Sequence, residues 1–150
     1  MVGMEILKPV VVLAAWTMVM WLWMYATRIP AINNLPKSAE PGADTGWTSA
    51  KLEALLDPKI QWKAHNYNHL HEAPTVFYAV AIVLAIIGHG DGFNAAVAWA
   101  YVGVRIVHSV FQATINKVIP RFALVVVSSL LLMILIFHAA IPIFDWHLYG

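Results

Sequence analysis

The sequence predicts an all-α fold, in which one domain over residues 1–150 forms a four-helix transmembrane bundle. Hydrophobic residues make up 61% of the chain and charged residues only 11%, whereas soluble domains contain about 25% charged residues. The apolar residues are concentrated in four segments, and a spanning helix needs roughly 20 such residues. We expect helices at residues 5–27, 58–88, 93–118 and 120–144. The formal net charge of +1 gives no sign of nucleic-acid binding.

The first helix is expected over residues 5–27, which is too long for the apolar part of a signal peptide, so we expect it to be retained. Residues 28–57 form the first connection and are predicted to be cytoplasmic. Its prolines predict irregular structure up to Trp47. Three leucines at helical spacing then predict a short helix at the membrane surface. The prolines are Pro30, Pro36 and Pro41, and the leucines are Leu52, Leu55 and Leu56.

The second helix is expected to start at Asp57 and Pro58, because a carboxylate can cap the first free amides and proline fits the first helical position. Continued to residue 88, it would be about 45 Å long. Its first turns should therefore stand clear of the roughly 30 Å hydrocarbon layer. Polar side chains at three- and four-residue spacing share one face of it. They are Gln61, His65, Asn68, His69 and Glu72.

Three glycines predict a tight turn after this helix, which makes the third helix, 93–118, its antiparallel neighbour. The third helix carries a second polar stripe, formed by Tyr101, Arg105, His108, Ser109, Gln112 and Asn116. Ionisable groups at membrane depth normally face a bundle interior or a cavity, and they mark function. Glu72 and His108 are equally far from the centre of the turn near residue 90, so they should lie at about the same depth. Arg105 comes one turn before His108, about 4.5 Å along the helix axis, which a long side chain can span. We therefore expect Glu72 and Arg105 to form an ion pair between the two helices.

The basic residues predict the orientation in the membrane. Most of the nine Lys and Arg residues lie in or beside the first and third connections, whereas Lys8 lies at the other side. By the positive-inside rule these connections are cytoplasmic and both termini lie outside. We expect a multi-pass protein of a bacterial inner membrane, in contact with membrane lipids.

Two motifs resemble the MAPEG family, the membrane-associated proteins of eicosanoid and glutathione metabolism. One is Asn-His-Leu-His-Glu-Ala-Pro-Thr-Val-Phe at residues 68–77, and the other is Arg105-Ile-Val-His108 followed by Arg121. The resemblance, to a divergent bacterial-type member, implies a homotrimer of four-helix subunits. It also implies that glutathione binds between subunits near the cytoplasmic side.

The resemblance further implies roles for individual residues. Arg28 and Arg121 would be catalytic, because an arginine near the sulfur favours the thiolate. Glutathione would be held by His65, Asn68, His69, Glu72, Arg105, His108 and Gln112. The implied function is a glutathione-dependent transferase or peroxidase that acts on a lipophilic electrophile. The chain departs from the family pattern at four positions: His65 and His69 replace Arg and Asn, Pro74 comes one residue early, and Gln112 replaces a frequent tyrosine.

Two alternatives remain open. Polar residues can join helices without catalysing anything, so the chain could be a lipid-binding protein or an accessory subunit of a larger membrane complex. The spacing of His65, His69 and Glu72, with His108 nearby, also permits a metal site. We prefer a hydrogen-bonded pocket to a metal site, because any histidine-rich helix face produces such spacing. The absence of cysteine excludes disulfides and thiolate ligands.

Overall fold

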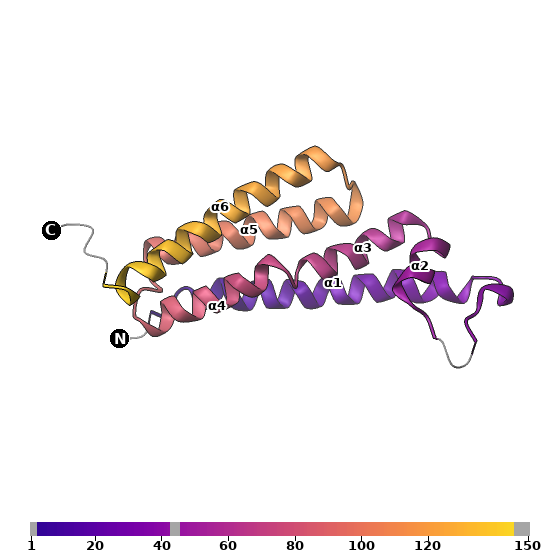
Figure 1. Cartoon of the computed structure of the whole chain (residues 1–150), viewed down its shortest axis with the longest axis horizontal. Helices are drawn as coiled ribbons and strands as arrows, with labels where there is room; N and C mark the ends of the chain where they lie inside the picture. Colours follow the sequence, from indigo (N-terminus) through magenta and orange to yellow (C-terminus); the bar gives the residue numbers. More distant parts are fainter. Residues whose placement is uncertain (1–2, 43–45, 146–150) are drawn as a thin grey trace.

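The computed structural model describes residues 3–42 and 46–145, and in these residues the fold is all-helical, without strands. Long helices run side by side along the molecule (Figure 1). The elements are α1 (Leu7–Asn33), a short 3-10 turn η1 (Lys37–Ala39), α2 (Ser49–Leu55), α3 (Pro58–His69), α4 (Ala73–Ile86), α5 (Phe93–Thr114) and α6 (Val118–Ile143).

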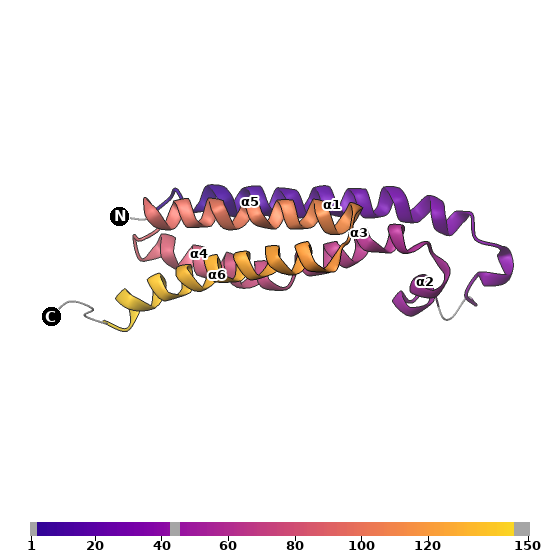
Figure 2. The ribbon, with the colours of Figure 1, turned by 90° about the horizontal axis from the view of Figure 1, so that it is seen from above.

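α1, the α3–α4 pair, α5 and α6 alternate in direction, so the connections gather at the two ends (Figure 1). α3 and α4 follow one another along α1, while α5 packs against α1, α3 and α6. Seen from above, α5 lies beside α1, and α4 lies with α6 (Figure 2). The corner between α5 and α6 stops short of the end of α1. α1 and α3 therefore project beyond it, and α2 lies at this projecting end (Figure 1).

In the described part of the chain, three helical segments are long and apolar enough to cross a membrane: Leu7–Asn33, Pro58–Ile86 and Val118–Ile143. The segments enclose an apolar core, in which the rings of Phe77 and Tyr101 stack with their centroids 4.5 Å apart. Many large apolar side chains on the outer faces remain exposed. An apolar exterior of this extent is what a lipid environment requires.

The first helix is longer than the sequence predicted, because α1 continues through Pro30 to Asn33 instead of ending at residue 27. Proline removes a single backbone donor, and its fixed φ is already helical. The irregular part of the connection therefore starts later than expected. The short helix predicted near Leu52 and Leu55 is confirmed as α2.

The second helix begins as predicted but is not continuous. The carboxylate of Asp57 accepts from the amide of Lys59 at 2.7 Å, with Pro58 in the first turn. α3 then ends at His69 and α4 begins at Ala73, because Pro74 has no amide hydrogen and its ring would clash with the carbonyl of Leu70. Glu72 lies at this break, with φ −92° and ψ −104°.

The turn between α4 and α5 holds the N-terminal segment. The amide of Gly3 donates to the carbonyl of Ala85 at 2.9 Å, and the amide of Ile6 donates to the carbonyl of Gly90 at 2.9 Å. The backbones of Gly3 and Gly90 approach so closely that a Cβ on Gly90 would collide with the carbonyl oxygen of Gly3. Glycine at position 90 thus permits this contact.

Candidate functional site

A cavity of about 340 Å³ opens between α1, α2 and α3, at the end of the molecule where α1 and α3 project beyond the α5–α6 corner. Charged, polar and apolar side chains share its wall. They are Met24, Arg28, Ser49, Glu53, Ala64, His65, Tyr67 and Asn68. The volume lies within the roughly 300–1,000 Å³ of small-molecule sites.

Arg28 is fixed in this cavity by a residue of α3. One Nη atom of its guanidinium donates to Oε1 of Gln61 at 2.8 Å, and Gln61 is only 1% exposed. The Nε atom of Arg28 is buried and has no hydrogen-bond partner among the described residues. A guanidinium has five donors in a planar fork. Arg28 is therefore held in place while it keeps donors for an anionic group.

Glu53 brings a negative charge to the same wall. Its carboxylate lies 3.0 Å from Nε2 of His65, and the side chains are 56% and 41% exposed, respectively. This contact joins α2 to α3. Thr48 caps α2 by accepting from the amide of Lys51 at 3.3 Å, which fixes the start of the helix that carries Glu53. The sequence did not single out Glu53, because the path of the first connection back to α3 leaves no periodic signal.

A second cluster surrounds the break between α3 and α4. The guanidinium of Arg105 donates to the carbonyl of His69 at 2.9 Å, and the ring of His69 lies 2.9 Å from the carboxylate of Glu72. The predicted ion pair between Glu72 and Arg105 is therefore wrong, since each contacts a different part of His69. The helix break explains the difference: it frees a carbonyl for the guanidinium and turns Glu72 outward, where its side chain is 64% exposed.

A third polar group joins three helices inside the protein. The hydroxyl of Ser109 accepts from Nε1 of Trp16 at 2.9 Å and from Nδ2 of Asn66 at 2.6 Å. Asn66 is completely buried. It lies off the polar stripe of the second helix, so periodicity could not identify it. This network links α1, α3 and α5, and part of the α5 stripe thus serves packing.

The predicted site residues fall into separate places. Arg28, His65 and Asn68 meet in the α1–α2–α3 cavity, and His69 and Glu72 follow on the partly exposed side of the break. Arg105, His108 and Gln112 are enclosed within the protein, each no more than 4% exposed. They do not line the cavity. Arg121 lies at the α5–α6 corner, where it donates to the side-chain oxygen of Asn116 at 2.5 Å.

The structure does not favour the metal alternative. His65 pairs with Glu53, whereas His69 pairs with Glu72. Within residues 3–42 and 46–145, no three His, Asp or Glu side chains come together in a way that could hold a metal ion. The two histidines thus have different acidic neighbours and do not form one ligand set.

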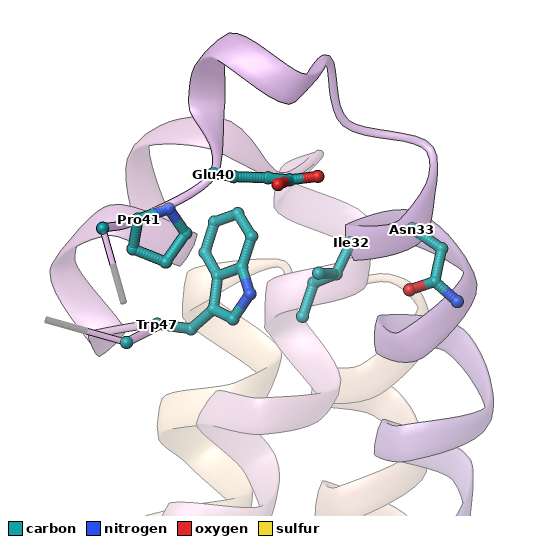
Figure 3. Close-up of a pocket in the computed structure, with 7 residues that line it drawn as sticks. Ile32, Asn33, Glu40, Pro41 and Trp47 are labelled. Carbon is teal, nitrogen blue, oxygen red and sulfur yellow. The ribbon is translucent and has the colours of Figure 1, made fainter. Parts of the chain in front are cut away.

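A larger hollow of about 590 Å³ lies beyond the end of α1. Figure 3 shows the ring of Trp47 between Pro41 and Ile32, with the carboxylate of Glu40 above it and Asn33 to the side. None of the predicted site residues lines it. Its described wall has a carboxylate but no basic side chain. An anionic ligand is therefore better served by the α1–α2–α3 cavity.

One of the comparisons with known proteins identifies a family. A model of the MAPEG family matches residues 6–141, from the segment before α1 to near the end of α6, and the match includes all the polar clusters described above. No curated protein and no solved structure matches the chain.

Proposed function

Because the chain is a membrane protein that belongs to the MAPEG family, we propose that it spans the bilayer four times and that three copies associate. α5 would be the fourth span. Its 22 residues correspond to about 33 Å, enough to cross the hydrocarbon layer. Its polar side chains are largely buried against other helices, while Trp99, Val107 and Val110 face outward.

The exposed polar face beside the helix break supports the association of subunits. Asn68 and Glu72 are exposed on a single chain, although Glu72 lies midway along the apolar segment Pro58–Ile86. A carboxylate facing lipid at this depth would be unfavourable by several kcal/mol. A neighbouring subunit, with a water-filled space between the two, would remove it from the lipid.

We further propose that the α1–α2–α3 cavity binds glutathione and that the protein transfers it to a lipophilic electrophile or uses it to reduce one. The observation that carries this proposal is the meeting of Arg28, Glu53, His65 and Asn68 in one cavity. Glutathione has two carboxylates, an ammonium group and a thiol. The cavity offers a guanidinium for a carboxylate, a carboxylate for the ammonium group, and an amide side chain for the peptide groups.

The reaction requires the thiolate, which is the nucleophilic form. A guanidinium beside the sulfur stabilises the thiolate and lowers the pKa of the thiol. Two roles need an arginine: one stabilises the thiolate and one holds a glutathione carboxylate. The described part of the cavity wall has one arginine, Arg28, which takes one of these roles. We assign the remaining role to Arg121 of an adjacent subunit. Met24 and Ala64 provide the apolar part of the wall, against which a lipophilic electrophile would bind.

Calorimetric titration of the purified protein in detergent tests this function. We expect saturable heat with millimolar glutathione, together with an increase in thiolate absorbance. Arg28→Gln should weaken binding at least about tenfold, because a charge-assisted hydrogen bond contributes about 1.5–3 kcal/mol. Lys37→Gln, which removes an exposed charge outside the cavity, is the matched control and should bind like the wild type. If wild-type protein releases no heat and produces no thiolate, the proposed activity is wrong.

A second candidate is a non-catalytic lipid-binding protein or an accessory subunit of a larger membrane assembly. The network of Ser109 with Trp16 and Asn66 favours it, because these polar groups join helices and are not available to a ligand. Arg105 also joins helices, because it donates to a backbone carbonyl of α3 and is only 4% exposed. This candidate predicts that the protein co-purifies with a partner and that glutathione does not bind.

A further inference from the structure

A small cavity lies at the opposite end of the molecule from the α1–α2–α3 cavity. Its volume is about 220 Å³, and its wall comes from the turn between α4 and α5, the start of α5 and the end of α6. These segments lie together at the end that holds the N-terminus (Figure 1). The lining residues are His89, Asn94, His138, Ile141 and Pro142.

Two hydrogen bonds determine the orientation of the Asn94 side chain and the tautomer of His138. Nδ2 of Asn94 donates to the backbone carbonyl of His89 at 2.8 Å. The amide oxygen of Asn94 therefore points the other way, where it lies 2.7 Å from Nδ1 of His138. An amide oxygen can only accept, so Nδ1 must carry the hydrogen. A neutral imidazole has one such hydrogen, and Nε2 of His138 is thus left with a free lone pair, as inferred from this bonding pattern.

The lone pair lies in a largely apolar setting. No hydrogen-bond partner for Nε2 of His138 occurs within residues 3–42 and 46–145. The ring of Phe93 lies 5.2 Å from the His138 ring, centroid to centroid. Ile141 and Pro142 provide the apolar part of the wall, and His89 and Asn94 line the rest. The cavity thus combines one oriented acceptor with apolar surfaces. Such a site fits a mainly apolar molecule that has one hydrogen-bond donor.

The depth of the cavity narrows the choice of ligand. His138 lies near the end of α6 at Ile143, about 7.5 Å along the helix axis. This is close to the expected boundary between hydrocarbon and water. Aromatic rings with a hydroxyl group favour this boundary, as tyrosine does, because one side is apolar and the other is hydrated.

We propose that this cavity binds a phenolic molecule, whose hydroxyl donates to Nε2 of His138 and whose ring packs against Ile141 and Pro142. The volume is sufficient, since a cavity of about 150 Å³ can take up benzene. A divalent metal is less suitable, because the described residues provide no group of three metal-ligating side chains here. The site is independent of glutathione, which would bind at the other end.

Nitrogen NMR of the full-length protein, labelled with 15N-histidine in nanodiscs, tests the proposal. His138→Gln assigns the resonance. Without ligand, the His138 signals should show hydrogen on Nδ1 and a free Nε2. Titration with p-cresol should shift the Nε2 resonance saturably. Toluene has the same ring without the hydroxyl and should bind about tenfold more weakly, the effect of losing one buried hydrogen bond.

Two variants separate binding from folding. Asn94→Ala should lose the fixed tautomer and bind p-cresol at least several-fold more weakly, whereas Ser129→Ala, a change on α6 outside the cavity, should keep the tautomer and p-cresol binding. Three results would overturn the proposal: hydrogen on Nε2 in the wild type, equal affinity for toluene and p-cresol, or a shift of Nε2 with Zn²⁺ but none with p-cresol. None of these results depends on whether glutathione binds.

Discussion

Arg28 and Gln61 illustrate, at the scale of single residues, how a buried amide prepares a charged group for binding. The sequence identified Arg28, His65 and Asn68 as candidate site residues, and these three line one cavity. It did not identify Glu53, which reaches the cavity through an irregular connection. It was wrong about the partner of Arg105, because helical spacing predicts which face a side chain occupies but not where a backbone carbonyl becomes free.

Ser109 provides a test at this scale. Ser109→Ala removes the acceptor of two donors, Trp16 and Asn66, and leaves both without a partner in the protein interior. We expect the free energy of unfolding to fall by about 1–3 kcal/mol, the usual effect of a buried unsatisfied group. Thermal unfolding in detergent, followed by circular dichroism, measures the change.

Ser129→Ala is the matched control, because Ser129 is a partly buried serine on α6 outside this network. It should change the free energy of unfolding by less than about 0.5 kcal/mol. Equal stability of the two variants would show that the Ser109 network does not hold the helices together.

At the scale of elements, composition and capping residues predicted the long helices well, and the structure differs where proline acts. Pro30 lies inside α1 without ending it, whereas Pro74 separates α3 from α4. The break at Pro74 is stabilised by a tertiary contact. Arg105 binds the carbonyl of His69, which the break leaves available. Contacts between helices of this kind cannot be derived from one segment of sequence.

Pro74→Ala tests the cause of this break. Alanine restores the amide hydrogen, so α3 and α4 should join into one helix, and the carbonyl of His69 should turn away from Arg105. The amide of residue 73 should then exchange at least about tenfold more slowly than in the wild type, and the new amide of residue 74 should be protected. Pro120→Ala, at the exposed first turn of α6, should leave exchange in this region unchanged. Unchanged exchange at residue 73, together with an unprotected amide at residue 74, would mean that another feature sets the break.

The turn between α4 and α5 provides another test of an element. Gly90→Ala places a methyl group against the backbone of Gly3, and we expect it to lower the free energy of unfolding by about 1–3 kcal/mol. Gly103→Ala is a suitable control, since a Cβ at this position of α5 would meet no atom within 4 Å. It should preserve or raise stability by up to about 1 kcal/mol. Thermal unfolding of both variants decides the matter, and a neutral Gly90 variant would contradict the close packing.

For the whole molecule, the alternation of helices brings the first connection and the α5–α6 corner toward one end (Figure 1). The sequence predicted this arrangement from four apolar segments. Membership of the MAPEG family is confirmed, whereas the association of three chains and the orientation in the membrane stay predictions. A single chain cannot reveal these two properties, because they depend on neighbouring subunits and on the bilayer.

The orientation is directly testable, because the chain has no cysteine. Lys51→Cys places a thiol on α2, and Asp91→Cys places one in the exposed turn at the other end. By the positive-inside rule, a membrane-impermeant maleimide added to intact cells should label position 91 and not position 51. Both should react after permeabilisation. Labelling of position 51 alone in intact cells would reverse the proposed topology and place the α1–α2–α3 cavity outside.

A density map of the purified protein with saturating glutathione tests the central claim most directly. The account predicts three chains around one axis and tripeptide density between α1, α2 and α3. One glutathione carboxylate or the sulfur should lie within hydrogen-bond distance of Arg28, and the ammonium group should lie beside Glu53. A well-resolved map with this cavity empty, or with glutathione bound away from Arg28, would contradict the account.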